Sequence, residues 1–540
     1  GSGNFLTESY LSLRRLENKI LKEIISIDGT MGTSMQMSLG DNAYNPIKVS
    51  ISQFYGIEIN DFAATVAKTA LWIAESQMIR ETEDIVHSQI EFFPLKTYAN
   101  IVEGNALEID WNDVIHNSEL DYIMGNPPFL GSRYMSNKQS NELKVVFNKT
   151  TGIGKLDYVT GWYKKSAEFI NNTEIECAFV STNSITQGEQ VSLFWKDIIK
   201  QNKIYINFAY QTFKWVSEAS DMAAVHCVII GFSKKERKEK YLYTSESQFK
   251  RVDNINAYLV NAPDIFIDAI SFPICNVPIL KTGTRVGAQQ YVFNEKDMIE
   301  FTKREPLSRK YFHEYLGGHE FINNKKRFCL YLEDCPVSDL ANMPLSRKII
   351  QEVLEDRINS NHKLKDFPKR YVKLSIPEND YIFIPQVSSE NRRYIPMGFV
   401  KKEIWTADPH FMLEKSNLYI FGILTSNVHM SWMRAVAGRL EMRYRYSNRI
   451  VYNTFPWPNP TEEQVNRIKT TAKEILQARK ENEGSSLANL YDEVMMPSNL
   501  RMAHQQNDKA VMEAYGFNIN MTESEAVAEL MKMYKELTDK

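Results

Sequence analysis

Two consecutive prolines directly after a short apolar run set the strongest limit on how this chain of 540 residues can fold. Residues 121–125 read as a strand, and Asn126-Pro127-Pro128-Phe129 follow it. Proline has no N–H to donate to a neighbouring strand, so the chain must leave the sheet at Pro127. The tetrapeptide therefore lies at the carboxyl end of a strand, where open α/β sheets bind their ligands.

The surrounding sequence alternates between strand and helix patterns. Asn60 and Asp61 are typical residues for the start of a helix. Alternation of this kind predicts a largely parallel sheet covered by helices on both faces, and thus an α/β fold class for residues 1–280. Strands are predicted at 51–59, 98–102, 177–181, 204–209 and 223–232, and helices at 62–79, 156–171 and 190–200.

Polar or small residues follow two other predicted strands in the same way. Glu58 and Ile59 end the first strand, and Gly104-Asn105-Ala106 follow the second. The chain opens on Gly1-Ser2-Gly3-Asn4-Phe5, directly before an apolar-periodic stretch. These residues are either a cloning remnant or a glycine-rich turn whose preceding strand is missing. A glycine turn before a helix lets the backbone approach a cofactor and offers it unpaired N–H groups.

The tetrapeptide suits a reaction at the amino group of an aromatic base. Such an amine is a poor nucleophile because its lone pair is delocalised into the ring. The Asn126 amide oxygen and the Pro127 carbonyl can accept its two N–H bonds and direct the lone pair toward an electrophile. Phe129 offers a face on which a base can stack, an interaction worth about 1–3 kcal/mol. A simple turn at the end of a strand is the alternative interpretation.

The composition changes after about residue 271, where prolines separate short aromatic and β-branched runs. This pattern predicts a separate α+β domain at 281–460, and residues 461–480 and 523–537 predict a helical region at 461–540. The formal charge of the chain is −3, but residues 281–460 carry 28 basic and 20 acidic side chains, a balance of +8. A basic domain in an acidic chain is typical of a surface that faces phosphates.

Arginines and aromatic residues alternate near the end of the basic domain. Glu441 can accept a hydrogen bond from cytosine and Arg443 can donate two to guanine, so the pair can read one G·C base pair. Phe213 and Trp215 either complete a base pocket or pack in a core. A solvated surface helix is the alternative for the arginine segment, whose members are Arg434, Arg439, Arg443, Arg445 and Arg449 with Trp432, Tyr444, Tyr446 and Tyr452.

Asn126 to Phe129 resembles the N-P-P-F/Y motif of amino-group methyltransferases that use S-adenosylmethionine, in its adenine-N6 form. The resemblance implies cofactor contacts in three places: the family's glycine-rich first motif at residues 1–5, the acidic strand end at Glu58, and the turn at residues 104–106 beside the cofactor's adenine. It also implies that Asp157-Tyr158 packs near the cofactor. The implied cofactor residues are Gly1, Gly3, Asn4, Phe5, Glu58, Ile59, Asn105 and Ala106, and the implied DNA contacts are Phe213, Trp215, Arg439, Glu441, Arg443 and Arg445.

A narrower resemblance covers nearly the whole chain. Ala437-Gly438-Arg439-Leu440, residues 445–447, 452–458 and 490–497 are similar to MmeI-like type IIG (type IIL) restriction-modification enzymes. The resemblance implies a Rossmann-like methyltransferase domain truncated at its N-terminus (1–280), an α+β target-recognition domain (281–460) and a helical C-terminal region (461–540). It further implies double-stranded DNA as partner, adenine-N6 methylation as activity, and a nuclease domain upstream in the parent polypeptide.

Three alternatives stay open on the sequence alone: a DNA-reading fragment without catalysis, a protein-glutamine methyltransferase and an RNA methyltransferase. The five cysteines form no C-x-x-C pair, and the nine histidines show no metal-ligand spacing, so we expect a reducing cytoplasm and no metal. No run reaches the roughly 18 apolar residues of a membrane span, so no membrane association is expected.

Overall fold

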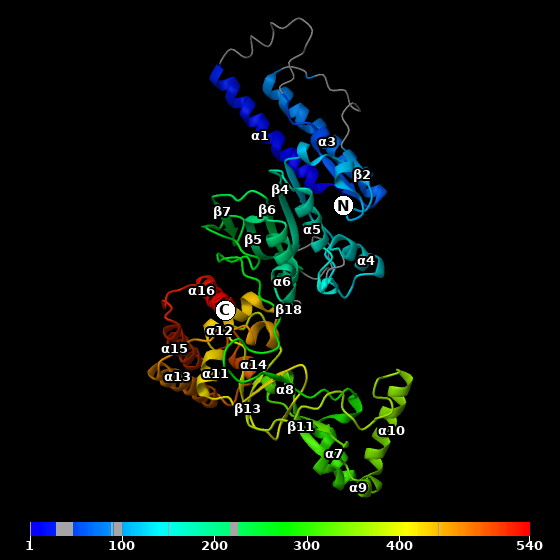
Figure 1. Ribbon diagram of the computed structural model, residues 1–540, viewed down its shortest axis with the longest axis vertical. Helices are drawn as coiled ribbons and strands as arrows, with labels where there is room; N and C mark the ends of the chain where they lie inside the picture. Colours follow the sequence, from blue (N-terminus) through cyan, green and yellow to red (C-terminus); the bar gives the residue numbers. More distant parts are fainter. Residues whose placement is uncertain are drawn as a thin grey trace. The chain divides into compact units, whose positions relative to one another are not determined.

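The computed structural model describes residues 2–28, 47–87, 90, 100–148, 151–215, 225–440 and 442–539. The chain forms two compact units (Figure 1). Unit 1 comprises Gly1–Asn183 and Leu193–Arg251, and unit 2 comprises Ser184–Ser192 and Val252–Lys540. The chain thus enters unit 2 briefly at residues 184–192, where the Gly188 N–H donates to the Val436 carbonyl at 3.0 Å, and then returns to unit 1.

The largest sheet of unit 1 has six strands in the order β3-β4-β6-β5-β7-β8. The β3–β4 and β5–β7 pairs are parallel, whereas β6 runs antiparallel to both of its neighbours. The expectation of a largely parallel sheet is therefore wrong at β6, because successive antiparallel strands such as β5 and β6 can pair without a crossover helix. The strands are β3 (Tyr122–Gly125), β4 (Glu176–Thr182), β5 (Tyr205–Trp215), β6 (Val225–Ser233), β7 (Lys240–Tyr243) and β8 (Phe249–Val252).

A second, two-stranded sheet pairs β1 (Tyr55–Glu58) with β2 (Asn100–Glu103) in parallel. Its first strand is shorter than the sequence predicts, because Ile51–Gln53 form a 3-10 turn capped by Ser50. Two long helices, α1 (Asn4–Asp28) and α3 (Asp61–Val86), pack beside this sheet (Figure 1). The Asn60 side chain caps α3 by accepting from the Ala63 N–H, as its residue type predicts.

Three further helices belong to this part of the sequence: α4 (Asn137–Val146), α5 (Thr160–Phe169) and α6 (Glu189–Trp195), the last continued by a π-helical turn at Lys196–Gln201. The predicted helix at 156–171 is confirmed as α5, whose Tyr163 is fully buried and stacks on Phe232 of β6. Helix α4 has no counterpart among the predicted helices, although the capping box of Ser136 and Gln139 marks its start.

Unit 2 confirms the α+β expectation with two four-stranded sheets, in the orders β10-β12-β11-β16 and β15-β13-β17-β9. Their strands are β9 (Lys281–Thr282), β10 (Val292–Asn294), β11 (Phe312–Leu316), β12 (Arg327–Leu330), β13 (Tyr381–Ile384), β15 (Gly398–Val400), β16 (Trp405–Thr406) and β17 (Phe411–Glu414). The helices that accompany them are α7 (Glu295–Arg304), α8 (Gly318–Asn323), α9 (Val337–Ala341) and α10 (Pro344–Asn359).

A third sheet of unit 2 has three strands in the order β14-β19-β18: β14 (Val387–Ser388), β19 (Arg443–Arg445) and β18 (Gly438–Leu440). Helices α11 (Leu418–Leu424) and α12 (Asn427–Val436) precede β18 in the sequence, and a π-helical turn at Asn448–Tyr452 follows β19.

The C-terminal region is helical, with α13 (Glu462–Glu481), α14 (Leu487–Leu490), α15 (Ser498–Tyr515) and α16 (Glu523–Thr538). Helices α13 and α15 pack with α11, and α16 packs with α12 (Figure 1). The helices predicted at 461–480 and 523–537 are confirmed as α13 and α16, whereas α15 has no predicted counterpart. In the part of the chain that the structure describes, no helix is long and apolar enough to cross a membrane.

Candidate active site and nucleic-acid interface

Three strands of unit 1 end at one edge of its six-stranded sheet. Strands β3, β4 and β5 point in the same direction, and Gly125 of β3 is level with Phe179 of β4. The tetrapeptide that follows Gly125 therefore lies at the carboxyl edge, as the two prolines predict. There Asn126 and Pro128 are exposed, Pro127 is buried and Phe129 is half-buried.

Strand β5 carries Phe213 and Trp215 to the same edge. A register shift between Tyr210 and Phe213 interrupts its pairing with β6, and the two aromatic rings beyond it lie 6.4 Å apart. Trp215 is 41% exposed, so it is not a core residue. The edge thus presents an amide, a proline turn and aromatic rings from two strands.

The parallel pairing of β1 and β2 brings the next two candidate segments together. Glu58 is level with Glu103, and the Gly104 N–H donates to the Glu58 carbonyl at 2.9 Å. Glu58 and the Gly104-Asn105-Ala106 turn are therefore neighbours at the carboxyl end of this sheet. Ile59, the next residue, is 66% exposed and leaves an apolar side chain at the surface.

The beginning of α1 lies beside this second sheet. A Cβ added to Gly3 would come within 2.6 Å of the Ala67 Cβ on α3, and Gly3 has a φ of +78°, so only glycine fits there without strain. Asn4 and Phe5, which begin α1, are exposed. Further along α1, the Ser9 hydroxyl lies 3.2 Å from the Met124 sulfur of β3. Gly1 lies outside the described residues.

Tyr158 links the two strand-end segments of unit 1, which are the tetrapeptide after β3 and the turn at residues 104–106 after β2. Its backbone N–H donates to the Leu130 carbonyl, directly after the tetrapeptide, at 2.9 Å. Its hydroxyl donates to the Glu142 carboxylate and is also hydrogen-bonded to the Asn105 side chain. Burial, and next the hydrogen bond to Glu142, raise the pKa of Tyr158, so the phenol stays protonated and keeps donating. Glu142 is not among the residues singled out from the sequence, because no motif marks it and only the fold brings it to Tyr158.

The three-stranded sheet of unit 2 separates the predicted arginines into two sets. Arg439 of β18 lies over the Tyr444 ring, 3.8 Å from its centroid, and both side chains are largely covered. Arg443 and Arg445 flank Tyr444 along β19, so they point to the opposite face, and both are exposed. Arg439 therefore supports the sheet, while Arg443 and Arg445 are presented to solvent. Glu441 lies outside the described residues.

In the described ranges, no group of three or more His, Cys, Asp or Glu side chains is placed to hold a metal ion. The carboxyl edge carries hydrogen-bond acceptors and aromatic stacking surfaces. Groups of this kind are able to bind and orient a planar, amine-bearing ring.

Comparison with known protein families places this arrangement in a class. Residues 1–244 match the MmeI DNA-methyltransferase domain, residues 261–459 the MmeI target recognition domain, and residues 460–540 the MmeI C-terminal domain. The chain therefore joins a methyltransferase domain to a target-recognition domain and a helical C-terminal domain.

Two relatives define the family more closely. The chain is 38% identical over 555 residues to DNA methyltransferase A of Bacillus subtilis (strain 168), in a match that covers 100% of this chain and 61% of that protein. It is 40% identical, with a TM-score of 0.87, to the type IIL restriction-modification enzyme MmeI solved in complex with DNA, over 100% of this chain and 72% of that one. The chain belongs to the MmeI family, and it spans about three fifths of the length of the Bacillus relative.

Proposed function

We propose that this chain methylates adenine at N6 in a specific sequence of double-stranded DNA, with S-adenosylmethionine as the methyl donor, as part of a restriction-modification enzyme. The observation that carries the proposal is the position of Asn126-Pro127-Pro128-Phe129 at the carboxyl edge of the sheet, linked through Tyr158 to the turn at Asn105.

The tetrapeptide provides what a target adenine needs. An adenine inside a duplex is out of reach, so it must rotate out of the stack. In the proposed complex it stacks on Phe129 and donates its two amino hydrogens to the Asn126 side chain and the Pro127 carbonyl. The burial of Pro127 and the rigidity of its ring hold that carbonyl in place. Pro128 turns the chain so that Phe129 lies beside the same position. Phe213 and Trp215 are proposed to complete the base pocket.

The neighbouring sheet fits the proposed cofactor. The Glu58 carboxylate suits the two hydroxyls of a ribose, and the exposed Ile59 offers an apolar face to an adenine ring. Asn105 and Ala106 would border that ring, and the start of α1, with Gly1, Gly3, Asn4 and Phe5, would face the amino-acid end. When bound, S-adenosylmethionine supplies a methyl group on a sulfonium, which is a good leaving group. A strong general base is therefore not required, and the proton can leave to water afterwards.

Unit 2 is proposed to read the DNA. Arg443 and Arg445 are exposed on one face of β19, where side chains can reach base edges or phosphates. We propose that Glu441 and Arg443 read one G·C pair and that Arg439 supports them through Tyr444. Both relatives are longer than this chain, and we propose a nuclease domain elsewhere in the parent polypeptide and a cytoplasmic location.

Replacement of the Asn126 side chain tests the catalytic part. Asn126→Ala removes one of the two acceptors for the amine and leaves the exposed backbone of the turn in place. We expect methyl transfer to duplex DNA to fall at least about 100-fold, with little change in DNA affinity measured by fluorescence anisotropy. A variant that keeps near-normal transfer would refute the assignment.

A DNA-reading protein without catalysis is the second candidate. The observation in its favour is that the described part of the chain pairs β1 only with β2 and β3 only with β4, so the two sheets are not hydrogen-bonded into one. Calorimetric titration with S-adenosylmethionine separates the candidates. Tight binding supports an enzyme, whereas no binding supports a reading module.

A further inference from the structure

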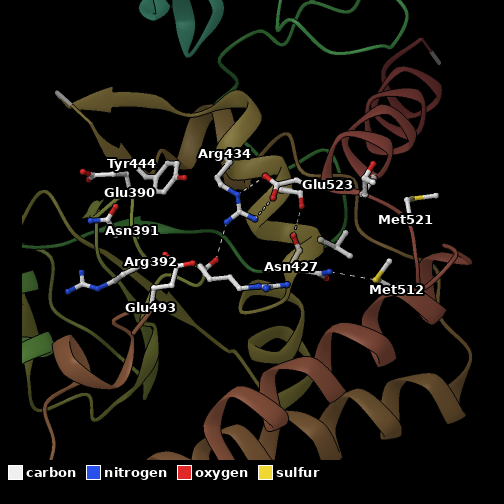
Figure 2. Close-up of a pocket in the computed structure, with 15 residues that line it drawn as sticks. Glu390, Asn391, Arg392, Asn427, Arg434, Tyr444, Glu493, Met512, Met521 and Glu523 are labelled. Carbon is white, nitrogen blue, oxygen red and sulfur yellow. Dashed lines mark hydrogen bonds and ion pairs between the residues drawn. The ribbon is translucent and has the colours of Figure 1, made fainter. Parts of the chain in front are cut away.

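Arg434, on the last turn of α12, lies where the helical C-terminal region meets the three-stranded sheet. Its Nε and Nη2 lie 2.6 Å and 2.8 Å from the two carboxylate oxygens of Glu523, the first residue of α16 (Figure 2). Its Nη1 donates to the Arg393 carbonyl at 3.0 Å. All three nitrogens of the guanidinium are thus used, and the paired geometry with a carboxylate is the most directional that arginine makes.

The same residue is connected to the three-stranded sheet from two sides. Arg439 of β18 donates to the Arg434 carbonyl at 3.4 Å and lies over Tyr444 of β19. On the other side, β14 pairs with Tyr444 through Ser388, and the chain then runs to Arg393. Arg434 therefore joins the segments that lead into both strands flanking β19, the strand that carries Arg443 and Arg445.

A cavity of about 440 Å³ lies at this place, so packing alone does not hold the sheet there. Tyr444, Arg434, Asn427, Glu493 and Glu523 are among the side chains that line it (Figure 2). Since side chains beside a cavity have fewer neighbours to restrain them, the polar contacts of Arg434 must do much of the positioning.

We propose that Glu523 is a positioning residue for DNA sequence reading. From the C-terminal region it holds Arg434, and through Arg434 it holds the sheet that presents Arg443 and Arg445 to the DNA. The Arg434 side chain is only 17% exposed. Without the carboxylate it turns toward solvent and releases the Arg393 carbonyl, and with it the segment that leads from β14. This inference rests on the proposed function, and it assigns to the C-terminal helices a part in specificity that their sequence does not show.

The test compares two glutamates of similar exposure that pair with different arginines. Glu523→Gln removes the charge without changing the shape. Glu513→Gln is the control, because the Glu513 side chain is exposed to a similar extent, 43% against 50%, and also pairs with an arginine, Arg467, between α15 and α13. Glu523→Asp, which keeps the charge, is the conservative variant. Each full chain is mixed with a pool of random duplex oligonucleotides, and the retained DNA is sequenced. Thermal midpoints are measured in parallel.

We expect wild type, Glu513→Gln and Glu523→Asp to enrich the same sequence motif. Glu523→Gln should lose about tenfold in enrichment at one or more positions of that motif, while its thermal midpoint stays close to that of Glu513→Gln. An unchanged motif for Glu523→Gln, or equal losses for both glutamine variants, would overturn the inference. A wild-type chain that enriches no motif would instead refute the proposed DNA reading, so the two failures can be told apart.

Discussion

Removal of one hydroxyl should test how the two strand-end segments of unit 1 are held together. The perturbation is Tyr158→Phe, which deletes the donor to Glu142 and the acceptor for Asn105 while keeping the ring. A hydrogen bond to a charged group contributes about 1.5–3 kcal/mol and a neutral one about 1 kcal/mol. The Glu142 side chain is 7% exposed and keeps only Lys138, at 3.7 Å, as a nearby partner among the described ion pairs.

These values set the expected size of the effect. We expect a loss of about 2–3 kcal/mol in the free energy of unfolding of unit 1, because the carboxylate stays buried while losing its donor. For a unit of this size the thermal midpoint should fall by roughly 5–10 °C. Because the Asn105 side chain also loses its contact with Tyr158 and keeps, among the described residues, only the one with the Leu107 N–H, its turn should open more often. Hydrogen exchange at residues 104–109 should accelerate, and affinity for S-adenosylmethionine should fall about tenfold, roughly 1.4 kcal/mol.

Tyr163→Phe is the matched control, because it also deletes one phenolic hydroxyl, bonded to Ser181 at 3.0 Å, but away from the turn. It should cost about 1 kcal/mol and leave exchange at 104–109 unchanged. The measurements are differential scanning calorimetry, exchange mass spectrometry and calorimetric titration. If Tyr158→Phe lowers the midpoint without changing exchange or cofactor affinity, the reasoning is refuted and Tyr158 is only a stabilising residue.

Three further outcomes follow from the geometry. Burial lowers the pKa of His429 to about 3. Between the unfolded value near 6.5 and the folded value only the unfolded state takes up the proton, so stability decreases as the pH is lowered, by up to about 1.4 kcal/mol per pH unit. Denaturant titrations at pH 7 and pH 5 should show a smaller loss for His429→Gln than for wild type. Gly231→Ala would place a Cβ within 2.0 Å of the Phe208 ring and should cost about 1–3 kcal/mol, measured by urea unfolding; an unchanged midpoint would mean that Phe208 moves freely. Alanine at both Arg443 and Arg445 should reduce the slope of log affinity for DNA against log salt concentration by about one for each phosphate that these arginines neutralise, whereas an unchanged slope would show that neither arginine neutralises a phosphate.

Local chemistry explains which features of unit 1 were predictable. Pro127 and Pro128 cannot continue a strand, and that rule alone places the tetrapeptide at the edge of the sheet. Glu58 and Asn105 each end a strand pattern, and parallel pairing then makes them neighbours. The direction of β6 was not predictable from its apolar pattern, because a buried strand has the same side-chain pattern whether its neighbours are parallel or antiparallel.

Contacts between residues that are distant in sequence could not be predicted from local sequence patterns. Glu142 and Glu523 are ordinary helix residues until the fold places Tyr158 and Arg434 beside them. The sequence predicts the arginine segment as one basic surface, yet the alternation of side chains along β18 and β19 turns Arg439 away from Arg443 and Arg445. A one-residue change of register would reverse that division, and composition carries no information about register.

The short passage of the chain through unit 2 at residues 184–192 bears on how new specificities can be assembled from relatives. A chimaera joined at residue 252 would transplant the sheet with Arg443 and Arg445 but leave Gly188 to the recipient. Gly188 meets Gly438 so closely that an added Cβ would lie 3.3 Å from the Gly438 Cα, and its φ is +62°. A recipient with another residue in place of Gly188 would strain the backbone at that φ and crowd the transplanted Gly438. Recombination of such enzymes should therefore exchange two separate stretches of the gene together, the long one and the short one.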